Sequence, residues 1–141
     1  MPEPTPQPLK VVAGLIVRDG RLLVCQRHVN SAFPLKWEFP GGKVEKDELE
    51  IDALRRELKE ELVIDVIKAS LFDRHQHVYP NGTAVSLSFY NVVEFTGEAQ
   101  NLVFQQISWA RLSDLEQLDF LEGDRPLIAR LIAESRARLP Q

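Results

Sequence analysis

The sequence predicts an α/β/α sandwich built on a mixed β-sheet, and three observations lead to this prediction. Strand-like runs follow one another along the chain, separated by turns rich in Gly, Pro, Asn and Asp. Residues 49–62 form an amphipathic segment with helical periodicity between these runs. A second such segment, residues 124–136, follows the last run. Helices of this kind can cover both faces of a sheet, which gives three layers.

The first half of the chain is predicted to begin with a hairpin. Asp19-Gly20 is a strong hairpin turn signal between two strand-like runs. A loop and a third, short run then lead into the Gly41-Gly42 turn and the helix at residues 49–62. The three runs are residues 9–17, 21–27 and 37–39, and the loop is residues 30–34.

The second half is predicted to contain another hairpin, a short strand and a terminal helix. Residues 66–79 and 84–93 flank the turn sequence Pro80-Asn81-Gly82. Residues 107–110 form the last strand-like run, and Ser113-Asp114 is expected to begin a short helical turn. The inward face of the terminal helix is predicted to carry Leu127, Ile128, Leu131 and Ile132.

Composition limits the classes of function. The 141 residues fit one domain, predicted to span residues 9–141, and the 44% hydrophobic content makes disorder unexpected. A net charge of −4 gives no basic footprint for duplex nucleic acid, whereas a local site can still bind a small anion. Cys25 is the only cysteine, so no intrachain disulfide can form, and its apolar strand favours a buried thiol.

The termini and hydropathy predict a cytoplasmic protein. No stretch is long and apolar enough to span a bilayer, and the first residues are rich in Pro rather than basic and then apolar. Residues 1–8, with four prolines, are predicted to form a flexible tail. Nothing in the sequence determines the oligomeric state.

The segment at residues 49–62 has three faces as a helix. Leu54, Leu58 and Leu62 recur every four residues and are expected to pack on the core. The side with Asp52, Arg55 and Lys59 is expected to be solvated, and Arg56 can pair with either Asp52 or Glu60.

The third face carries three carboxylates. Glu57, Glu60 and Glu61 stand at i, i+3 and i+4, so their side chains converge within about one turn. Such a cluster of hard oxygen ligands suits Mg²⁺. Taken alone, the stretch fits an ordinary Glu- and Arg-rich surface helix equally well.

The wider pattern resembles the box of the Nudix hydrolase family. The order is Gly42, five residues, Glu48, seven residues, Arg56-Glu57-Leu58, one residue, and Glu60-Glu61. The flanking sequence from Trp37 to Glu45, WEFPGGKVE, narrows the resemblance to the MutT-type branch. The resemblance implies the Nudix fold and an Mg²⁺-dependent enzyme, with Mn²⁺ as a substitute, that cleaves a nucleoside triphosphate into a monophosphate and pyrophosphate.

The resemblance also assigns roles to the box residues. The carbonyl of Gly41 would bind the metal together with Glu57, Glu60 and Glu61, and Glu57 is the first choice for general base. Lys43 would stabilise the departing pyrophosphate, although an exposed lysine can equally be just a solvated charge. Glu48 is expected in the first helical turn, where it supports the site by meeting Arg56.

Comparison with MutT-type relatives points to Arg27, Phe39 and Asp124 for base recognition. Phe39 is either a stacking ring or a core residue, and Arg27 is either a ligand or a rim residue with a buried stem. Asp124 is either a ligand or a helix N-cap. An ionised Asp124 could only accept hydrogen bonds, which modestly favours a guanine edge over a cytosine edge.

Two positions depart from the family pattern. Val63 replaces the Gly that usually closes the box, and since a β-branched residue avoids the left-handed region, the helix is expected to end by another route. Val103 replaces a Glu that many relatives carry six residues before the Trp of a late strand, here Trp109, which is expected in the core. The metal site would then depend on the box helix alone.

Several alternatives stay open at this level. The favoured substrate is an oxidised guanine nucleotide, and the main rival is a cytidine or methylated-cytidine triphosphate. A nucleotide-binding module without turnover is a third hypothesis, for which Val103 is the supporting feature. His75 and His77 alternate on one strand face, but without an evident third ligand they are better explained as polar strand residues than as a zinc pair.

Overall fold

The computed structural model describes residues 7–138, with eight strands, two α-helices and two 3-10 helices in that part of the chain. Most of the tail predicted at residues 1–8 therefore lies outside the described residues. The elements are β1 (Leu9–Leu15), β2 (Val17–Arg18), β3 (Arg21–Gln26), β4 (Trp37–Glu38), β5 (Gly41–Lys43), α1 (Glu50–Leu62), β6 (Asp65–Val78), β7 (Ala84–Thr96), β8 (Gln106–Arg111), η1 (Leu112–Gln117), η2 (Glu122–Asp124) and α2 (Arg125–Arg138).

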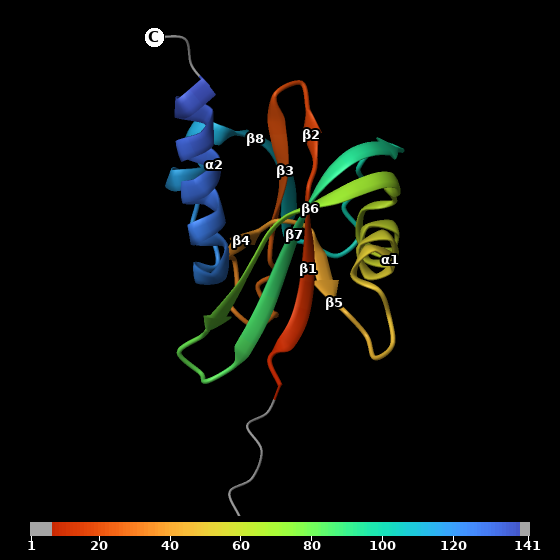
Figure 1. Cartoon of the computed structure of the whole chain (residues 1–141), viewed down its shortest axis with the longest axis vertical. Helices are drawn as coiled ribbons and strands as arrows, with labels where there is room; N and C mark the ends of the chain where they lie inside the picture. Colours follow the sequence, from red (N-terminus) through yellow and green to blue (C-terminus); the bar gives the residue numbers. More distant parts are fainter. Residues whose placement is uncertain (1–6, 139–141) are drawn as a thin grey trace, which may run out of the picture.

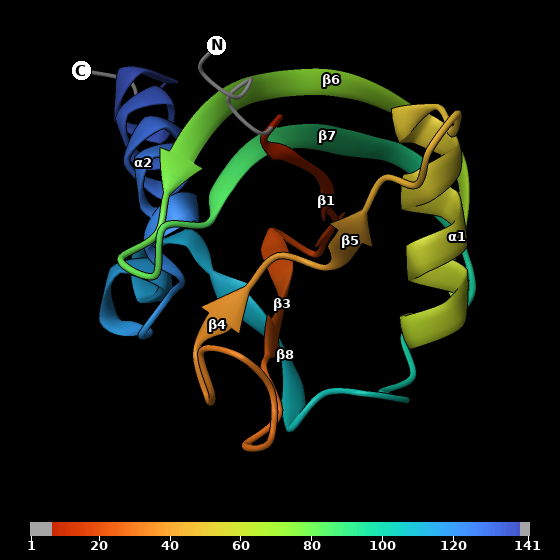
Figure 2. The ribbon, with the colours of Figure 1, turned by 90° about the horizontal axis from the view of Figure 1, so that it is seen from below.

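The strands form two four-stranded sheets between the helices (Figures 1 and 2). In the first sheet, of order β5-β1-β7-β6, β1 runs parallel to β7 and the other pairs are antiparallel. The second sheet is antiparallel, with β3 paired to β2, β4 and β8. The predicted strand at residues 9–17 is divided at Ile16, where the chain passes from the first sheet to the second.

The two helices lie on opposite sides of the strands, which confirms the α/β/α sandwich (Figure 1). Each helix covers its own cluster of buried side chains. Leu54, Leu58 and Leu62 are fully buried beneath α1, as the leucine stripe predicted. Cys25 is buried in the same cluster, while Trp109 is only half-buried against it. On the other side, Leu127 and Ile128 of α2 are buried, and Leu131 and Ile132 are half-buried against that core.

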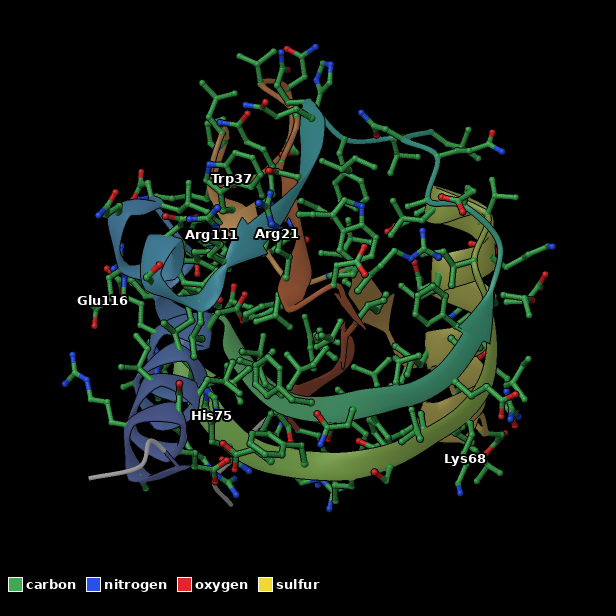
Figure 3. The ribbon with its side chains drawn as sticks, turned by 90° about the horizontal axis from the view of Figure 1, so that it is seen from above. Arg21, Trp37, Lys68, His75, Arg111 and Glu116 are labelled. Carbon is green, nitrogen blue, oxygen red and sulfur yellow. The ribbon has the colours of Figure 1, made fainter. Side chains whose placement is uncertain are left out.

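Both predicted hairpins are present. Asp19 and Gly20 adopt φ angles of 53° and 74° between β2 and β3, as expected for a tight turn. β6 and β7 pair along their length and turn through Gly82, whose φ is 87°. Side chains stand on both faces of these two arching strands (Figure 3), and most of those on β6 are exposed or half-buried.

The end of α1 differs from the sequence-based expectation. Val63 does adopt the left-handed conformation, with φ 59° and ψ 34°. The backbone N–H groups of Val63 and Ile64 donate to the last helical carbonyls, those of Lys59 and Leu58, at 3.2 Å each. The expectation that a valine would force another type of ending was therefore wrong. Ile64 is completely buried, and this anchor offsets the local strain.

Candidate functional site

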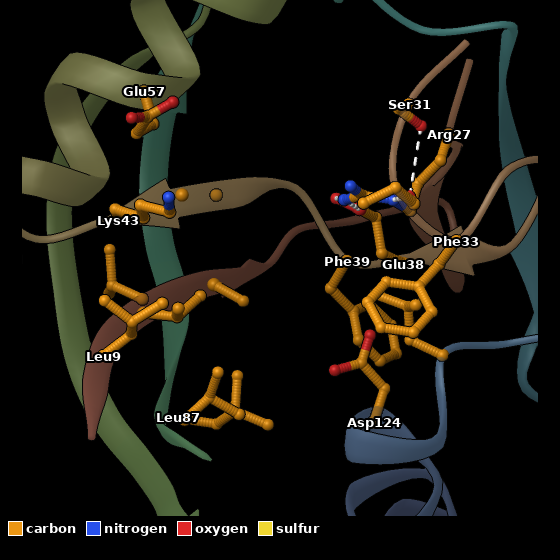
Figure 4. A pocket seen from close by; sticks show the side chains of 18 of the residues that line it. Leu9, Arg27, Ser31, Phe33, Glu38, Phe39, Lys43, Glu57, Leu87 and Asp124 are labelled. Atoms are coloured by element: carbon orange, nitrogen blue, oxygen red, sulfur yellow. Dashed lines mark hydrogen bonds and ion pairs between the residues drawn. The ribbon is translucent and has the colours of Figure 1, made fainter. Parts of the chain in front are cut away.

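A pocket of about 800 Å³ extends from α1 to the beginning of α2 (Figure 4). One end, here called the acidic end, is lined by Gly41, Gly42, Lys43, Glu57 and Glu61. The other, here called the aromatic end, is lined by Arg27, Phe33, Glu38, Phe39, Tyr79 and Asp124. The volume is typical of a small-molecule site. Most members of the two predicted groups thus share one cavity, whereas Glu48, Arg56 and Glu60 do not line it.

The glycine turn allows α1 to approach β5 closely. A Cβ atom at Gly42 would lie 2.4 Å from Cδ of Glu57, and one at Gly41 would lie 1.9 Å from the carbonyl oxygen of Val12. Neither distance is compatible with a side chain. The two glycines are therefore required by close packing, which brings Glu57 directly against the turn.

Arg56 organises the residues around the turn. Its guanidinium donates to Glu48 at 2.9 and 3.0 Å, to Glu57 Oε1 at 2.9 Å and to the carbonyl oxygen of Lys43 at 3.0 Å. The hydrogen bonds from Arg56 lower the pKa of Glu48 to about 2. The predicted Glu48–Arg56 contact is present, but Glu48 lies in the loop before α1 rather than in its first turn, because the helix begins at Glu50.

Of the two further ion-pair partners predicted for Arg56, only one lies beside it in the structure. Glu60 lies 3.7 Å from the guanidinium, as one of the two alternatives predicted. Asp52 instead faces Arg55 at 3.8 Å. Asp52, Arg55 and Lys59 are exposed, which confirms the solvated side of the helix.

Glu57 and Glu61 form the acidic end of the pocket. Oε2 of Glu61 is buried and has no hydrogen-bond partner. Burial, together with the neighbouring carboxylate of Glu57, raises the pKa of Glu61 to about 8. Of the two carboxyl groups, Arg56 pairs with Glu57 only, so the Glu61 carboxyl has no positive side chain of its own to offset the neighbouring carboxylate.

The predicted third carboxylate does not line the pocket. Glu60 is exposed to solvent beside Arg56, and no group of three His, Cys, Asp or Glu side chains within residues 7–137 is arranged to hold a metal ion. The convergence expected from helical spacing is therefore realised for Glu57 and Glu61 only. Lys43 is exposed and lines the same end (Figure 4).

The acidic end fits a hard divalent cation. Its donor groups are carboxylate oxygens, and the unpartnered Glu61 oxygen beside Glu57 is the kind of group that a cation satisfies. Val103, at the position where many relatives carry a Glu, is half-exposed and lines the pocket without supplying an oxygen.

Arg27 lies at the aromatic end and is tied to Glu38. The guanidinium lies 2.8 Å from the Glu38 carboxylate, and Nε donates to the carbonyl oxygen of Ala32 at 2.6 Å. The Glu38 side chain is only 15% exposed, and this partial burial raises its pKa despite the ion pair. Arg27 thus holds a neighbouring loop as well as facing the pocket.

Phe39 is a core residue at the pocket wall. Its side chain is only 3% exposed, and its ring packs against Phe89 and Phe120 at centroid distances of 6.3 and 5.2 Å. The ring therefore lacks an open face for stacking, and of the two interpretations the core assignment fits the structure.

Asp124 lies just before α2 with its carboxyl group buried at the aromatic end. Burial and the nearby Glu38 raise its pKa to about 8, although the backbone N–H of Phe39 donates a hydrogen bond to it. Burial thus favours the neutral carboxyl, which can donate as well as accept. The sequence does not reveal this burial, and the base edge that Asp124 binds stays a prediction.

Three residues of the aromatic end were missed at the sequence level as pocket residues. Glu38 lies within the recognised motif, but its pairing with Arg27 could not be seen. Phe33 and Tyr79 occur in a loop and at a strand end, where no periodicity indicates their direction. Their rings lie 4.8 Å apart.

The two strand histidines do not form a zinc site among the described residues. His75 Nε2 lies 2.7 Å from the carbonyl oxygen of Gly123, where β6 passes the beginning of α2 (Figure 3). His77 Nε2 lies 3.9 Å from Glu122. Among the described residues, His77 Nε2 is buried without a hydrogen-bond partner, so the interpretation of the pair as polar strand residues stays a prediction.

The family comparison decides the class of this site. A NUDIX domain model matches residues 8–131, which include both ends of the pocket. The chain belongs to the Nudix family. Its box therefore lies on α1 and on the turn before it, and the chain is a Nudix hydrolase rather than a module without turnover. Nudix hydrolases generally need a divalent metal, which agrees with the acidic end.

Named relatives of this Nudix hydrolase are similar over nearly the whole chain. The CTP pyrophosphohydrolase of Escherichia coli is 36% identical over 92% of this chain and 96% of its own length. The 8-oxo-dGTP diphosphatase of Haemophilus influenzae is 36% identical over 90% of this chain and 93% of its own length.

Solved structures are similar as well. The E. coli ORF135 protein superposes with a TM-score of 0.80 at 35% identity, covering 94% of each chain. The MutT Nudix hydrolase from Burkholderia pseudomallei gives 0.79 at 30% identity, covering 88% of this chain and 98% of its own. No helix in the described part of the chain is long and apolar enough to cross a membrane.

Proposed function

We propose that this Nudix hydrolase cleaves nucleoside triphosphates into a monophosphate and pyrophosphate with Mg²⁺ as its metal. The observation that carries the proposal is the division of one pocket into an acidic and an aromatic end. The acidic end suits a metal-bound triphosphate, and the aromatic end offers a buried carboxyl and rings for a base. The relatives named for 8-oxo-dGTP and CTP support this substrate class.

Glu57 and Glu61, with the carbonyl of Gly41, would hold the cation. The bound metal would neutralise phosphate charge and lower the pKa of a water molecule. Glu57 is our candidate for the group that accepts the water proton, because Gly42 and Arg56 fix its position. Glu48 in turn accepts a hydrogen bond from Arg56 and so fixes the position of its guanidinium.

Lys43 is the candidate for charge stabilisation on the leaving pyrophosphate. Its side chain is exposed at the acidic end, so the ammonium can meet a phosphate without displacing a protein partner. The reaction is a hydrolysis. The water oxygen forms a bond to the phosphorus that stays with the monophosphate, the phosphoanhydride bond breaks, and pyrophosphate leaves.

For the base, a guanine-type nucleotide such as an oxidised guanine triphosphate is the first candidate. A cytidine or methylated-cytidine triphosphate is the second, and the raised pKa of Asp124 favours it more than the sequence suggested. A neutral carboxyl can donate to N3 of cytosine while accepting from the amino group. A cytoplasmic location and a lack of duplex binding stay predictions.

The test is pyrophosphate release with Mg²⁺ across normal, oxidised and methylated nucleoside triphosphates. The expected result is release from a guanine-type or cytidine-type substrate, with most turnover lost in Glu57→Gln and the melting temperature little changed. Release of inorganic phosphate alone would contradict the proposed bond cleavage. Near-normal turnover of folded Glu57→Gln would remove Glu57 from the reaction.

A further inference from the structure

Phe33 lies in the loop between β3 and β4 and has an unusual backbone. Its φ is 53°, and Leu35, two residues later, has a φ of 63°. Bulky residues rarely occupy this left-handed region, and such strain persists only where neighbouring contacts enforce it. The loop therefore adopts a costly conformation around one aromatic side chain.

Arg27 supplies the contacts that hold this loop. Its Nε donates to the carbonyl oxygen of Ala32 at 2.6 Å, and its backbone N–H donates to the carbonyl oxygen of Lys36 at 2.8 Å. Its own carbonyl accepts from the N–H of Leu35 at 3.1 Å. The segment that carries Phe33 is thus fixed on both sides by one residue.

The held conformation places the ring in the pocket instead of solvent. Phe33 lines the aromatic end with Asp124, and its ring centroid lies 4.8 Å from that of Tyr79 at an interplanar angle of 40° (Figure 4). The side chain is only half-buried, whereas Phe39 is enclosed by other rings. Phe33 is therefore an aromatic residue of this end that keeps surface available to a ligand.

We propose that Phe33 is a substrate-binding residue that stacks on the planar base of the substrate, while Asp124 binds the edge of that base. The assignment rests on the proposed function, because it takes the aromatic end as the base site. An aromatic face binds any planar base, so Phe33 contributes affinity and orientation. The choice between bases stays with the carboxyl.

The test uses Phe33→Asn, Phe33→Tyr and Val29→Ala. Asparagine tolerates the left-handed backbone but has no ring, tyrosine restores the ring, and Val29 is an exposed residue of the same loop that serves as control. Binding of GMP and CMP without metal is measured by calorimetry, together with the melting temperature. Inhibition by inorganic tripolyphosphate with Mg²⁺ reports on the acidic end.

We expect Phe33→Asn to weaken monophosphate binding roughly five- to a hundredfold, which is the usual effect of removing an aromatic ring that stacks on a base. Its melting temperature should not fall, and tripolyphosphate inhibition should be unchanged. Phe33→Tyr and Val29→Ala should bind like the wild type. Unchanged GMP and CMP binding in Phe33→Asn would overturn the proposal, and so would a loss that tyrosine fails to restore.

The measurements distinguish a failure of the proposed function from a failure of the stacking role. If the wild type releases no pyrophosphate from any triphosphate, that function fails, yet Phe33-dependent binding of a monophosphate would still support the stacking role. If the wild type hydrolyses triphosphates but Phe33→Asn keeps full monophosphate affinity, the function stands and the stacking role is rejected.

Discussion

Glu57 packs so closely against Gly42 that a Cβ atom there would lie 2.6 Å from each of its carboxylate oxygens. Gly42→Ala should therefore displace the Glu57 side chain. We expect kcat for pyrophosphate release to fall by about a hundredfold, because a misplacement of about 1 Å can have that effect. Gly20→Ala, in a distant turn with no atoms near the added methyl, is the control for activity. An active Gly42→Ala enzyme would show that the contact is not needed.

Divalent cation should stabilise the folded protein through Glu61. Binding at about a hundredfold above Kd adds about 2.7 kcal/mol, which corresponds to roughly 5–10 °C in melting temperature for a domain of this size. Glu61→Gln should reduce this shift, because the unpartnered oxygen that a cation would satisfy is replaced. Glu116→Gln, on the exposed surface, should keep it. Equal shifts in all three proteins would place the cation elsewhere.

Asp124 should make base preference depend on pH. Below its pKa of about 8 the carboxyl can donate to N3 of cytosine, and above that pKa it only accepts. The ratio of kcat/KM for cytidine-type to guanine-type triphosphates should therefore fall as pH rises from 7 to 9. In Asp124→Asn the ratio should not change with pH. A wild-type ratio that is equally flat would withdraw Asp124 from base recognition.

Val63 offers a stabilising substitution. A left-handed β-branched residue costs about 1–2 kcal/mol, and glycine removes this strain while adding a smaller entropic cost. We expect Val63→Gly to raise the free energy of unfolding by about 0.5–1 kcal/mol, measured by urea denaturation. Val93→Gly, at an exposed position within β7, should lower it. A loss of stability in both variants would mean that the burial of Val63 outweighs its strain.

Glu50 should make stability depend on acid pH. Burial alone would raise the pKa of Glu50, but hydrogen bonds from Ser88, Arg74 and Tyr90 outweigh it and lower the pKa below 4.5. A lowered pKa stabilises the fold above the unfolded-state value, and this contribution is lost as pH falls. Glu50→Gln should therefore cost about 1–3 kcal/mol at pH 7 and progressively less as the pH falls below 4.5.

The control for this measurement lies on the same helix. Asp52 is exposed and faces Arg55 at 3.8 Å, so Asp52→Asn should change stability little at either pH. Urea midpoints at pH 7 and pH 3 provide the comparison. A Glu50→Gln penalty that is the same at both values would mean that packing, and not charge, holds the residue.

Local patterns predicted the parts of the fold that depend on neighbours in sequence. The leucines of α1 were placed correctly by their spacing, and both hairpins by their turn residues. The way in which α1 ends at Val63 was not predicted correctly, because the burial of Ile64 overrides the backbone preference of the valine. Tertiary packing decided that residue, and packing is invisible in a short window.

The same limit applied to the candidate site. The box residues were found by spacing, whereas the environment of Asp124 depends on a parallel bridge between Trp37 and Phe120. The backbone N–H of Trp37 donates to the carbonyl oxygen of Asp119, and the backbone carbonyl of Trp37 accepts from the N–H of Leu121, at 2.9 Å each. This contact brings the beginning of α2 beside β4 and buries the carboxyl next to Glu38. No periodic signal connects segments so distant in sequence.

The two ends of the pocket are supported by different hydrophobic clusters. The carboxylates stand on a helix packed over one cluster, while Phe39 belongs to the other and Phe33 packs against it. Substitutions in the second cluster can therefore reshape the recognition of a base with little disturbance to the hydrolytic helix. Such a division would let a duplicated gene acquire a new nucleotide preference in small steps, each leaving a working hydrolase.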